Sequence, residues 1–255
     1  MIRGLLLLSI FSFYQAGAVA QQLPKLFLVG DSTVNNSSGN FRGWGNVLAE
    51  YFDPTKIEVV NKARGGRSSR TFITEGLWDE LTPLLSKGDI VLIQFGHNDG
   101  GSLDKERARG SVRGIGNETQ DVTIEATQKL ETVRTFGSYL RTYISDAKAK
   151  GAIVVLVSPV PRNQWRDGKV VRAGDSYGGW SKAIAKETSV FFLDLNEITA
   201  LKYEKIGQEK VGADYFTTID HTHTSLAGAL VNAESVVEGL RKIKQLKLDR
   251  FLAKR

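Results

Sequence analysis

The chain has 255 residues, carries a formal net charge of +6 and contains no cysteine. This length suits one globular domain with a substantial core, and the missing cysteines exclude a small fold held together by disulfides. A basic protein can bind nucleic acid or another polyanion, but the basic residues are scattered and no nucleic-acid-binding motif is present. We therefore expect an ordinary soluble protein without a nucleic-acid partner.

Residues 1–20 have the pattern of a secretory signal peptide. Arg3 supplies a positive charge, an apolar run extends from Leu5 to Phe13, and Ala18-Val19-Ala20 is a small-residue cleavage pattern. The apolar run is short for a membrane anchor and no second span follows, so we expect no stable membrane insertion after cleavage. We expect a secreted or periplasmic protein, and the lack of disulfides in an exported chain favours a bacterial host.

Five short apolar runs alternate with helix-like segments along the rest of the chain. The runs are rich in Val, Ile, Leu and Phe and lack polar alternation, which is typical of strands buried on both faces of a parallel sheet. Alternating strands and helices predict a three-layer α/β/α sandwich around a five-stranded parallel sheet. The expected strands are 25–30, 57–61, 89–95, 152–158 and 190–195, and the expected helices are 44–51, 74–85, 123–150, 176–188 and 225–243.

No linker, repeat or low-complexity tract divides residues 21–255, so we expect one domain there. Segments 100–122 and 161–176 are polar, and we expect them to be long loops beside the carboxyl edge of the sheet. Loops in that position often determine specificity.

Ser32 lies two residues after Gly30, where the first expected strand ends. Open α/β sheets bind their ligands at this edge, and a serine there becomes a nucleophile if a base removes its proton. A turn or a helix cap is the plainer interpretation of an isolated Asp31-Ser32 pair.

Asp220 and His223 lie close together near the end of the chain. At this spacing the carboxylate can orient the imidazole, so the pattern indicates Ser32 as nucleophile, His223 as base and Asp220 as the base's partner. A metal site made by Asp220, His221 and His223 is the competing interpretation. We favour it less, because the only further histidine is His97 and no cysteine is available.

Two further polar segments follow the second and third expected strands. Gly65-Gly66 lets the backbone approach a ligand closely, so the Gly66 amide is a candidate donor to an oxyanion. The side-chain amide of Asn98 is another, although both segments also suit ordinary turns. We expect the next residue, Asp99, to be a loop carboxylate and not an orienting group.

Arg64, Arg67 and Arg70 surround Gly66 and are candidates for a clamp on substrate carboxylates, which arginine can bind through two parallel hydrogen bonds. Solvated loop arginines are the alternative. Trp165 is a candidate platform for a sugar ring, whereas we expect Trp44 in the core.

The four blocks that contain Ser32, Gly66, Asn98 and His223 stand in order, each near the end of a successive element. Together they resemble the SGNH (GDSL-type) hydrolase superfamily, over nearly the whole chain after residue 25. The resemblance implies a flavodoxin-like fold and ester hydrolysis without a metal or cofactor. It also implies that Ser32, His223 and Asp220 are catalytic, and that the Ser32 and Gly66 amides and the Asn98 side chain form the oxyanion hole.

Within the superfamily, the segments Gly30–Val34, Ala63–Arg70, Phe95–Gly101 and Asp220–Ser225 are most similar to the rhamnogalacturonan acetylesterase family. That resemblance implies an acetylated acidic plant polysaccharide as the substrate. Two alternatives stay open: a related esterase acting on acetylated xylan or small acyl esters, and an inactive module that only binds polysaccharide.

Overall fold

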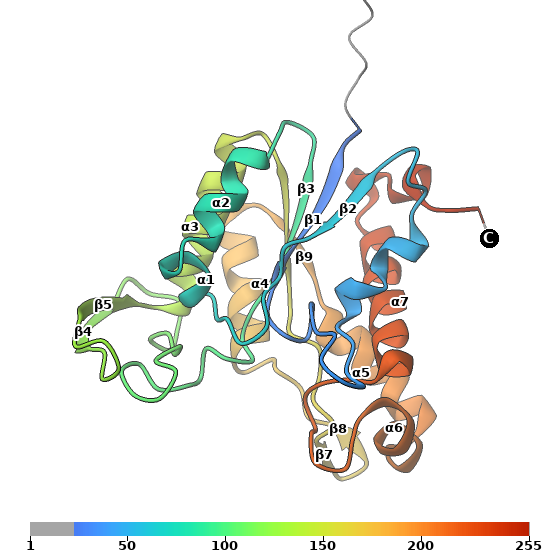
Figure 1. Cartoon of the computed structure of the whole chain (residues 1–255). Helices are drawn as coiled ribbons and strands as arrows, with labels where there is room; N and C mark the ends of the chain where they lie inside the picture. The colour runs from blue at the N-terminus through green and yellow to red at the C-terminus, as the bar shows by residue number, and fades with distance from the viewer. Residues whose placement is uncertain (1–22, 255) are drawn as a thin grey trace, which may run out of the picture.

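The computed structural model describes residues 23–254, which form a three-layer sandwich (Figure 1). A five-stranded sheet lies in the middle, and its strands run in the order β2-β1-β3-β6-β9 with all neighbouring pairs parallel. This order is that of flavodoxin-like folds, so the predicted architecture is confirmed. The strands are β1 (Lys25–Gly30), β2 (Glu58–Asn61), β3 (Ile90–Gln94), β6 (Ile153–Val157) and β9 (Phe191–Leu193).

The two faces of the sheet are covered by two different hydrophobic clusters. In β1, Leu26 and Leu28 point to one cluster while Phe27 and Val29 point to the other, as the alternation of side chains along a strand requires. Burying each such side chain contributes about 1.5–3 kcal/mol, which explains why runs without polar residues form the central strands.

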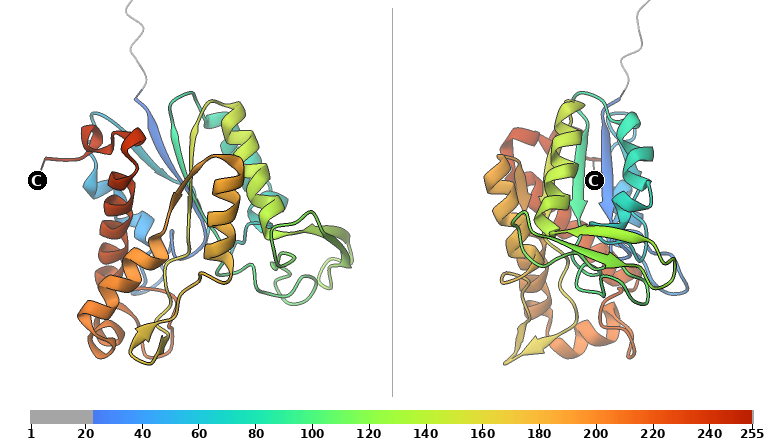
Figure 2. Two further views of the ribbon diagram at one scale, coloured as in Figure 1. Left: turned by 180° about the vertical axis from the view of Figure 1, so that it is seen from behind. Right: turned by 90° about the vertical axis from the view of Figure 1, so that its left-hand side faces the viewer.

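The first face is covered by α7 (Leu226–Lys242) and by the short 3₁₀ helices η1 (Trp44–Asn46) and η2 (Leu48–Tyr51). The opposite face is covered by α2 (Leu77–Leu81), α3 (Phe136–Ala149) and α4 (Tyr177–Thr188). Figure 2 shows these helices on both sides of the sheet. The other helices are α1 (Thr71–Thr74), η3 (Thr82–Leu84), α5 (Leu195–Ile206), α6 (Gln208–Tyr215), η4 (Lys244–Leu246) and η5 (Leu248–Phe251).

The predicted helix over residues 123–150 is wrong in its first half. Residues there form an antiparallel hairpin of β4 (Thr119–Thr123) and β5 (Leu130–Arg134), and α3 begins only after Thr135. Val122 and Val133 are buried between polar neighbours that are exposed or half-buried, so the segment has the period of a strand. The Thr135 hydroxyl accepts a hydrogen bond from the Ser138 amide and thereby caps α3.

Other predicted helices are broken into shorter pieces. Residues 44–51 form the two 3₁₀ helices, and residues 74–85 are divided because Gly76 adopts a φ of 80° between α1 and α2. Segment 161–176 is not entirely a loop, since it contains the small hairpin of β7 (Trp165–Arg166) and β8 (Lys169–Val170). Helices α5 and α6 were not predicted.

Both hairpins lie at the carboxyl end of the sheet (Figures 1 and 2). The β4–β5 hairpin projects on one side, and β7–β8 projects with α6 on the other. Within residues 23–254, no helix combines the length and the apolar character needed to cross a membrane. The predicted signal peptide, residues 1–20, lies outside the described residues.

Candidate active site

Three side chains from opposite ends of the chain meet at the carboxyl edge of the sheet. The Ser32 Oγ lies 2.8 Å from Nε2 of His223. The other ring nitrogen, Nδ1, lies 2.7 Å from Oδ2 of Asp220. With a neutral imidazole protonated on Nδ1, His223 donates to Asp220 and accepts the hydroxyl proton of Ser32. The three residues selected from the sequence therefore form one hydrogen-bonded chain.

The turn after β1 fixes the position of Ser32. The buried Asp31 carboxylate accepts hydrogen bonds from the backbone amide and the hydroxyl of Thr33, at 2.8 and 2.7 Å. A Cβ at Gly30 would lie 2.6 Å from a methyl group of Val34, so only glycine permits the chain to turn this closely at the end of the strand. Ser32 is held at the tip of a rigid turn.

Asp220 is held as an ionised partner for His223. Burial alone would raise the pKa of its carboxyl, but hydrogen bonds from the His223 ring and from the backbone amides of His223 and Thr222 outweigh it and lower the pKa below the ordinary value. The two amides donate to Oδ1 at 2.9 and 2.7 Å, which leaves Oδ2 for the ring. The carboxylate can therefore stabilise an imidazolium that forms beside it.

Gly66 and Asn98 line the same cleft as Ser32. The preceding glycine packs directly against the serine, since a Cβ at Gly65 would lie 3.6 Å from the Ser32 Cβ. Gly66 has a φ of 80°, in the region that favours glycine. One N–H of the Asn98 amide donates to the Arg67 carbonyl at 2.8 Å, and this anchors the side chain beside the cleft. Both groups therefore line the cleft beside Ser32.

Asp99 does more than the loop carboxylate that the sequence suggested. It is fully buried and accepts hydrogen bonds from the backbone amide and hydroxyl of Ser69 and from the hydroxyl of Ser111. It therefore joins the loop that contains Gly66 to the segment after residue 100, and it acts as a positioning group for both.

The three arginines beside Gly66 have separate surroundings. Arg70 is buried, pairs with Glu131 at 2.7 Å and donates to the carbonyls of Leu103 and Gly110, so the expected substrate contact is wrong for this residue. Arg67 pairs with Glu75. Arg64 is exposed and is not among the residues that line the cleft.

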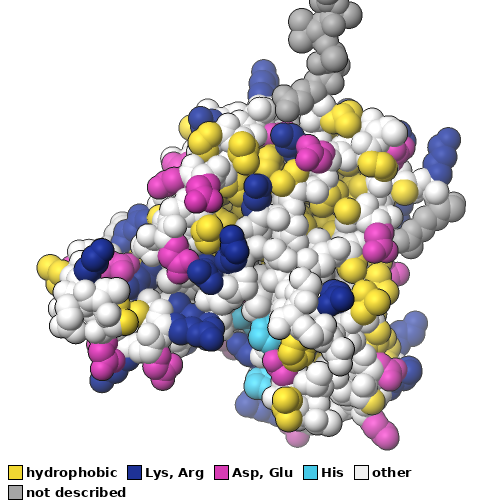
Figure 3. All heavy atoms as spheres, viewed as in Figure 1, with side chains coloured by type: hydrophobic (Ala, Val, Ile, Leu, Met, Phe, Trp, Pro, Cys, Tyr) yellow, Lys and Arg dark blue, Asp and Glu magenta, His cyan; other side chains and the backbone are white. Residues whose placement is uncertain are grey.

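Three other arginines line the cleft in their place, and the sequence analysis missed them. Arg107 and Arg109 come from the segment after β3, and a Cβ at Gly66 would lie 3.5 Å and 4.0 Å from their Nη1 atoms. Arg162 follows β6 and lines the same cleft. In the space-filling view, histidine side chains lie in a hollow with Lys and Arg nearby (Figure 3). Segments 100–122 and 161–176 were expected to determine specificity, and the arginines within them could have been chosen as substrate-binding candidates from the sequence.

Three aromatic residues lie in different surroundings. Trp165 is half-buried, donates to Asn163 and packs against a small cluster around Tyr203, so its side chain contributes to the base of the β7–β8 hairpin. Phe41 lines the cleft, with its ring centroid 5.5 Å from that of His223. Trp44 is buried in the core, as predicted.

His97 and His221 also line the cleft, but neither bonds to Ser32. Among residues 23–254, no group of three or more His, Cys, Asp or Glu side chains is placed to hold a metal ion. The cleft has a volume of about 780 Å³, enough for a sugar-sized ligand.

Residues 28–229 match the model of the GDSL-like lipase/acylhydrolase family. The chain belongs to this family. It is 34% identical over 215 residues to a rhamnogalacturonan acetylesterase of Emericella nidulans, covering 84% of each chain. It is 31% identical over 223 residues to the probable rhamnogalacturonan acetylesterase YesY of Bacillus subtilis, covering 86% of this chain and 93% of the other. These matches confirm the resemblance found in the four blocks and show that this family member is a carboxylic-ester hydrolase.

Solved structures support the same fold. The YxiM protein of Bacillus subtilis superposes with a TM-score of 0.70 at 26% identity, and the match covers 88% of this chain and 57% of that one. An acetylxylan esterase of Geobacillus stearothermophilus superposes with a TM-score of 0.53 at 22% identity, covering 85% and 94% of the two chains.

Proposed function

We propose that this GDSL-family hydrolase is an exported carbohydrate esterase that removes acetyl groups from rhamnogalacturonan. The hydrogen-bonded chain from Ser32 through His223 to Asp220, at the base of a cleft lined by arginines, is the observation that carries the proposal. The names of the relatives at 31–34% identity support the substrate class, and the pattern of residues 1–20 supports export.

The reaction has two acyl-transfer steps. His223 removes the proton of Ser32 as its Oγ attacks the acetyl carbonyl, and the same proton then passes to the departing sugar oxygen. Asp220 stabilises the imidazolium between these transfers. Water, deprotonated by His223, then hydrolyses the acetyl-enzyme and releases acetate.

The negative charge that forms on the carbonyl oxygen needs nearby donors in both steps. The Ser32 and Gly66 amides and the free N–H of Asn98 are the donors we assign. They are fixed before substrate binds, because Asn98 is anchored on Arg67 and the Gly66 loop on Asp99. Such preorganised donors contribute a large part of the rate enhancement in acyl transfer.

The deciding experiment measures acetate release from acetylated rhamnogalacturonan, acetylated xylan and a small chromogenic acetate. We expect the highest kcat/KM on rhamnogalacturonan, and we expect the Ser32→Ala variant to be inactive on all three. An organophosphonate should label Ser32 covalently in the unchanged protein. Preferred hydrolysis of xylan would refute the substrate assignment. Activity that survives in Ser32→Ala would refute the mechanism, and a folded protein without esterase activity would indicate a binding module.

A further inference from the structure

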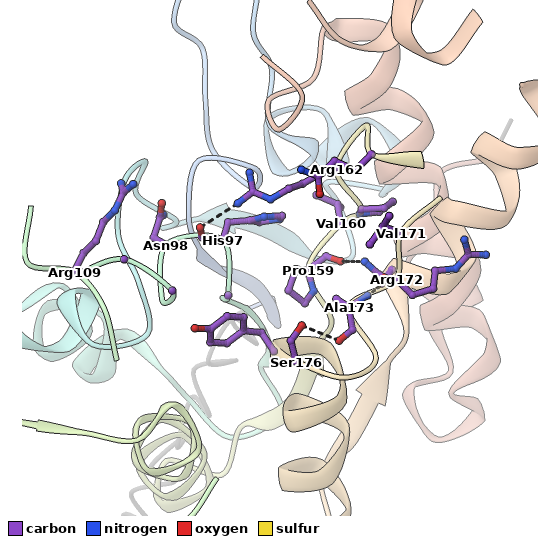
Figure 4. A pocket seen from close by; sticks show the side chains of 17 residues that line it. His97, Asn98, Arg109, Pro159, Val160, Arg162, Val171, Arg172, Ala173 and Ser176 are labelled. Atoms are coloured by element: carbon purple, nitrogen blue, oxygen red, sulfur yellow. Dashed lines mark hydrogen bonds between the residues drawn. The ribbon is translucent and has the colours of Figure 1, made fainter. Parts of the chain in front are cut away.

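A second cavity lies directly beside the catalytic cleft. Its volume is about 480 Å³, and it shares His97, Asn98, Arg109 and Arg162 with the cleft around Ser32. Most of the remaining wall comes from the segment between β6 and α4 and from the beginning of α4 (Figure 4), and Asn196 of α5 and the glycines around Asn98 complete it. A cavity of this size accommodates one sugar ring, and a polymer that occupies the cleft can continue into it.

Two arginines in the shared wall have no acidic partner. No hydrogen bond or ion pair joins Arg109 to another described residue, and Arg162 donates only to neutral oxygens, the Thr222 hydroxyl and the His97 carbonyl. The contrast is Arg172 in the same cavity, which pairs with Glu197 and Glu204. Figure 4 shows Arg109 and Arg162 on either side of Asn98.

This arrangement of charge favours an anionic ligand. Burial lowers the pKa of both Arg109 and Arg162, and this loss of water outweighs the attraction of the Asp31 carboxylate, to which neither guanidinium is hydrogen-bonded. A ligand carboxylate between them would supply the missing partner and two or more charge-assisted hydrogen bonds.

Two buried polar atoms of the cavity wall also have no hydrogen-bond partner: Nε2 of His97 and Oη of Tyr177. Burial lowers the pKa of His97 to about 4, so the ring is neutral, and its remaining nitrogen hydrogen-bonds the backbone of Val160. Nε2 is therefore an acceptor. Burial raises the pKa of Tyr177 to about 12, so its hydroxyl keeps its proton and can donate. A sugar hydroxyl can serve both, since it donates and accepts.

We propose that this second cavity binds a uronic acid residue of the same polymer, with the uronate carboxylate between Arg109 and Arg162 and its hydroxyls on His97 and Tyr177. The inference rests on the proposed function, because it assumes a polysaccharide in the cleft, but it assigns recognition to a place separate from the reacting atoms. It also explains why an enzyme that hydrolyses neutral acetyl esters has two arginines without a carboxylate partner in the wall between its two cavities.

Binding measured without hydrolysis tests this assignment. In the Ser32→Ala background, calorimetric titration with trigalacturonate is compared with the uncharged trigalactose. We expect trigalacturonate to bind at least tenfold more tightly, with an affinity that falls as salt is raised. Arg109→Gln or Arg162→Gln should each weaken trigalacturonate binding roughly tenfold or more, as expected for a lost charged hydrogen bond. The matched control is Arg166→Gln, an exposed arginine on the neighbouring hairpin that lines neither cavity.

Two further variants separate the second cavity from the cleft. Val171 lines only the second cavity and is 41% exposed, so Val171→Trp should obstruct it without disturbing the core. Its control is Leu201→Trp, at an exposed apolar position on α5. Tyr177→Phe removes only the unpartnered hydroxyl and should weaken binding several-fold.

Each outcome has a definite meaning. Equal binding of the two trisaccharides, or unchanged trigalacturonate affinity in the arginine variants, would overturn the inference. If Val171→Trp and Tyr177→Phe bind normally while the arginine variants do not, the carboxylate lies in the catalytic cleft and the second-cavity assignment is wrong. Acetate release by the unchanged protein tests the proposed function independently, since these titrations need no turnover.

Discussion

The buried carboxylate of Asp99 accepts hydrogen bonds from both the backbone amide and the hydroxyl of Ser69. Asp99 directly follows Asn98, and Ser69 lies three residues after Gly66, so this contact fixes the two candidate oxyanion donors relative to each other. Burial, the main cause, raises the pKa of Asp99 to about 7, although the hydrogen bonds from Ser69 and Ser111 oppose the shift. The positioning group thus titrates near neutrality.

We predict that Asp99 makes the stability of the fold depend on pH. In the unfolded chain an aspartate ionises near its ordinary pKa of about 4, whereas in the folded protein it keeps its proton up to about pH 7. The folded state therefore holds more protons between these values, and this contribution to the free energy of unfolding is complete below about pH 4 and declines as pH rises through 7. Urea midpoints measured from pH 4 to 8 should decline less steeply in Asp99→Asn. Asp175→Asn, at an exposed site, is the control, and parallel curves for Asp99→Asn and the unchanged protein would contradict the prediction.

We predict that Asp220→Asn lowers kcat on a chromogenic acetate by about 10⁴-fold, the usual effect of replacing the orienting acid of such a triad by its amide. The amide cannot stabilise the imidazolium and favours the wrong tautomer of His223. The control is Asp214→Asn, which changes an exposed carboxylate paired with Lys210 and should leave kcat unchanged. A loss smaller than tenfold in Asp220→Asn would show that His223 works without this partner.

We predict that Asn98→Ala lowers kcat by roughly 10²–10³-fold, the typical cost of one oxyanion donor. KM for the small acetate should change little, because the lost hydrogen bond strengthens only as charge forms on the carbonyl oxygen. The substitution also removes the anchor on the Arg67 carbonyl, which should cost about 1 kcal/mol of unfolding free energy. If a folded Asn98→Ala protein keeps more than a tenth of the turnover, Asn98 does not belong to the hole.

We predict that Arg70→Met destabilises the fold by about 3 kcal/mol, because it removes a buried cation and leaves the Glu131 carboxylate and the carbonyls of Leu103 and Gly110 without their donor. Arg141→Met breaks the more exposed pair with Glu187 and should cost about 1 kcal/mol or less. Urea unfolding of both variants measures the difference. Equal losses would mean that the Arg70 pair is no stronger than a surface contact.

The central sheet and the Ser32–His223 pair could be predicted from the sequence because both depend on local patterns. Apolar runs identify the strands, and parallel strands bring the residues after their carboxyl ends to one edge. No long-range side-chain contact had to be known. The same reasoning placed Gly66 and Asn98 in the cleft that contains Ser32.

The cleft arginines could not be predicted in this way. The segment that carries Arg107 and Arg109 is held by Arg70, which is far from it in sequence, and by the hydrogen bond between Ser111 and the buried Asp99. Closeness to Gly66 in the sequence, which selected Arg70 as a candidate, therefore does not show which arginines face the cleft. The hairpin at 119–134 was missed for a related reason, since its few apolar residues were interpreted with helical spacing although only Val122 and Val133 are buried.

The two carbonyls held by Arg70 have a consequence for how this scaffold can diversify. Leu103 and Gly110 lie at the two ends of the segment that carries Arg107 and Arg109, and the Arg70 guanidinium donates to both of their carbonyls. Residues 104–109 between them contribute no side chain to the hydrophobic core. We expect chimaeras that import a different six-residue tip to retain the hydrolytic centre while accepting a different polymer.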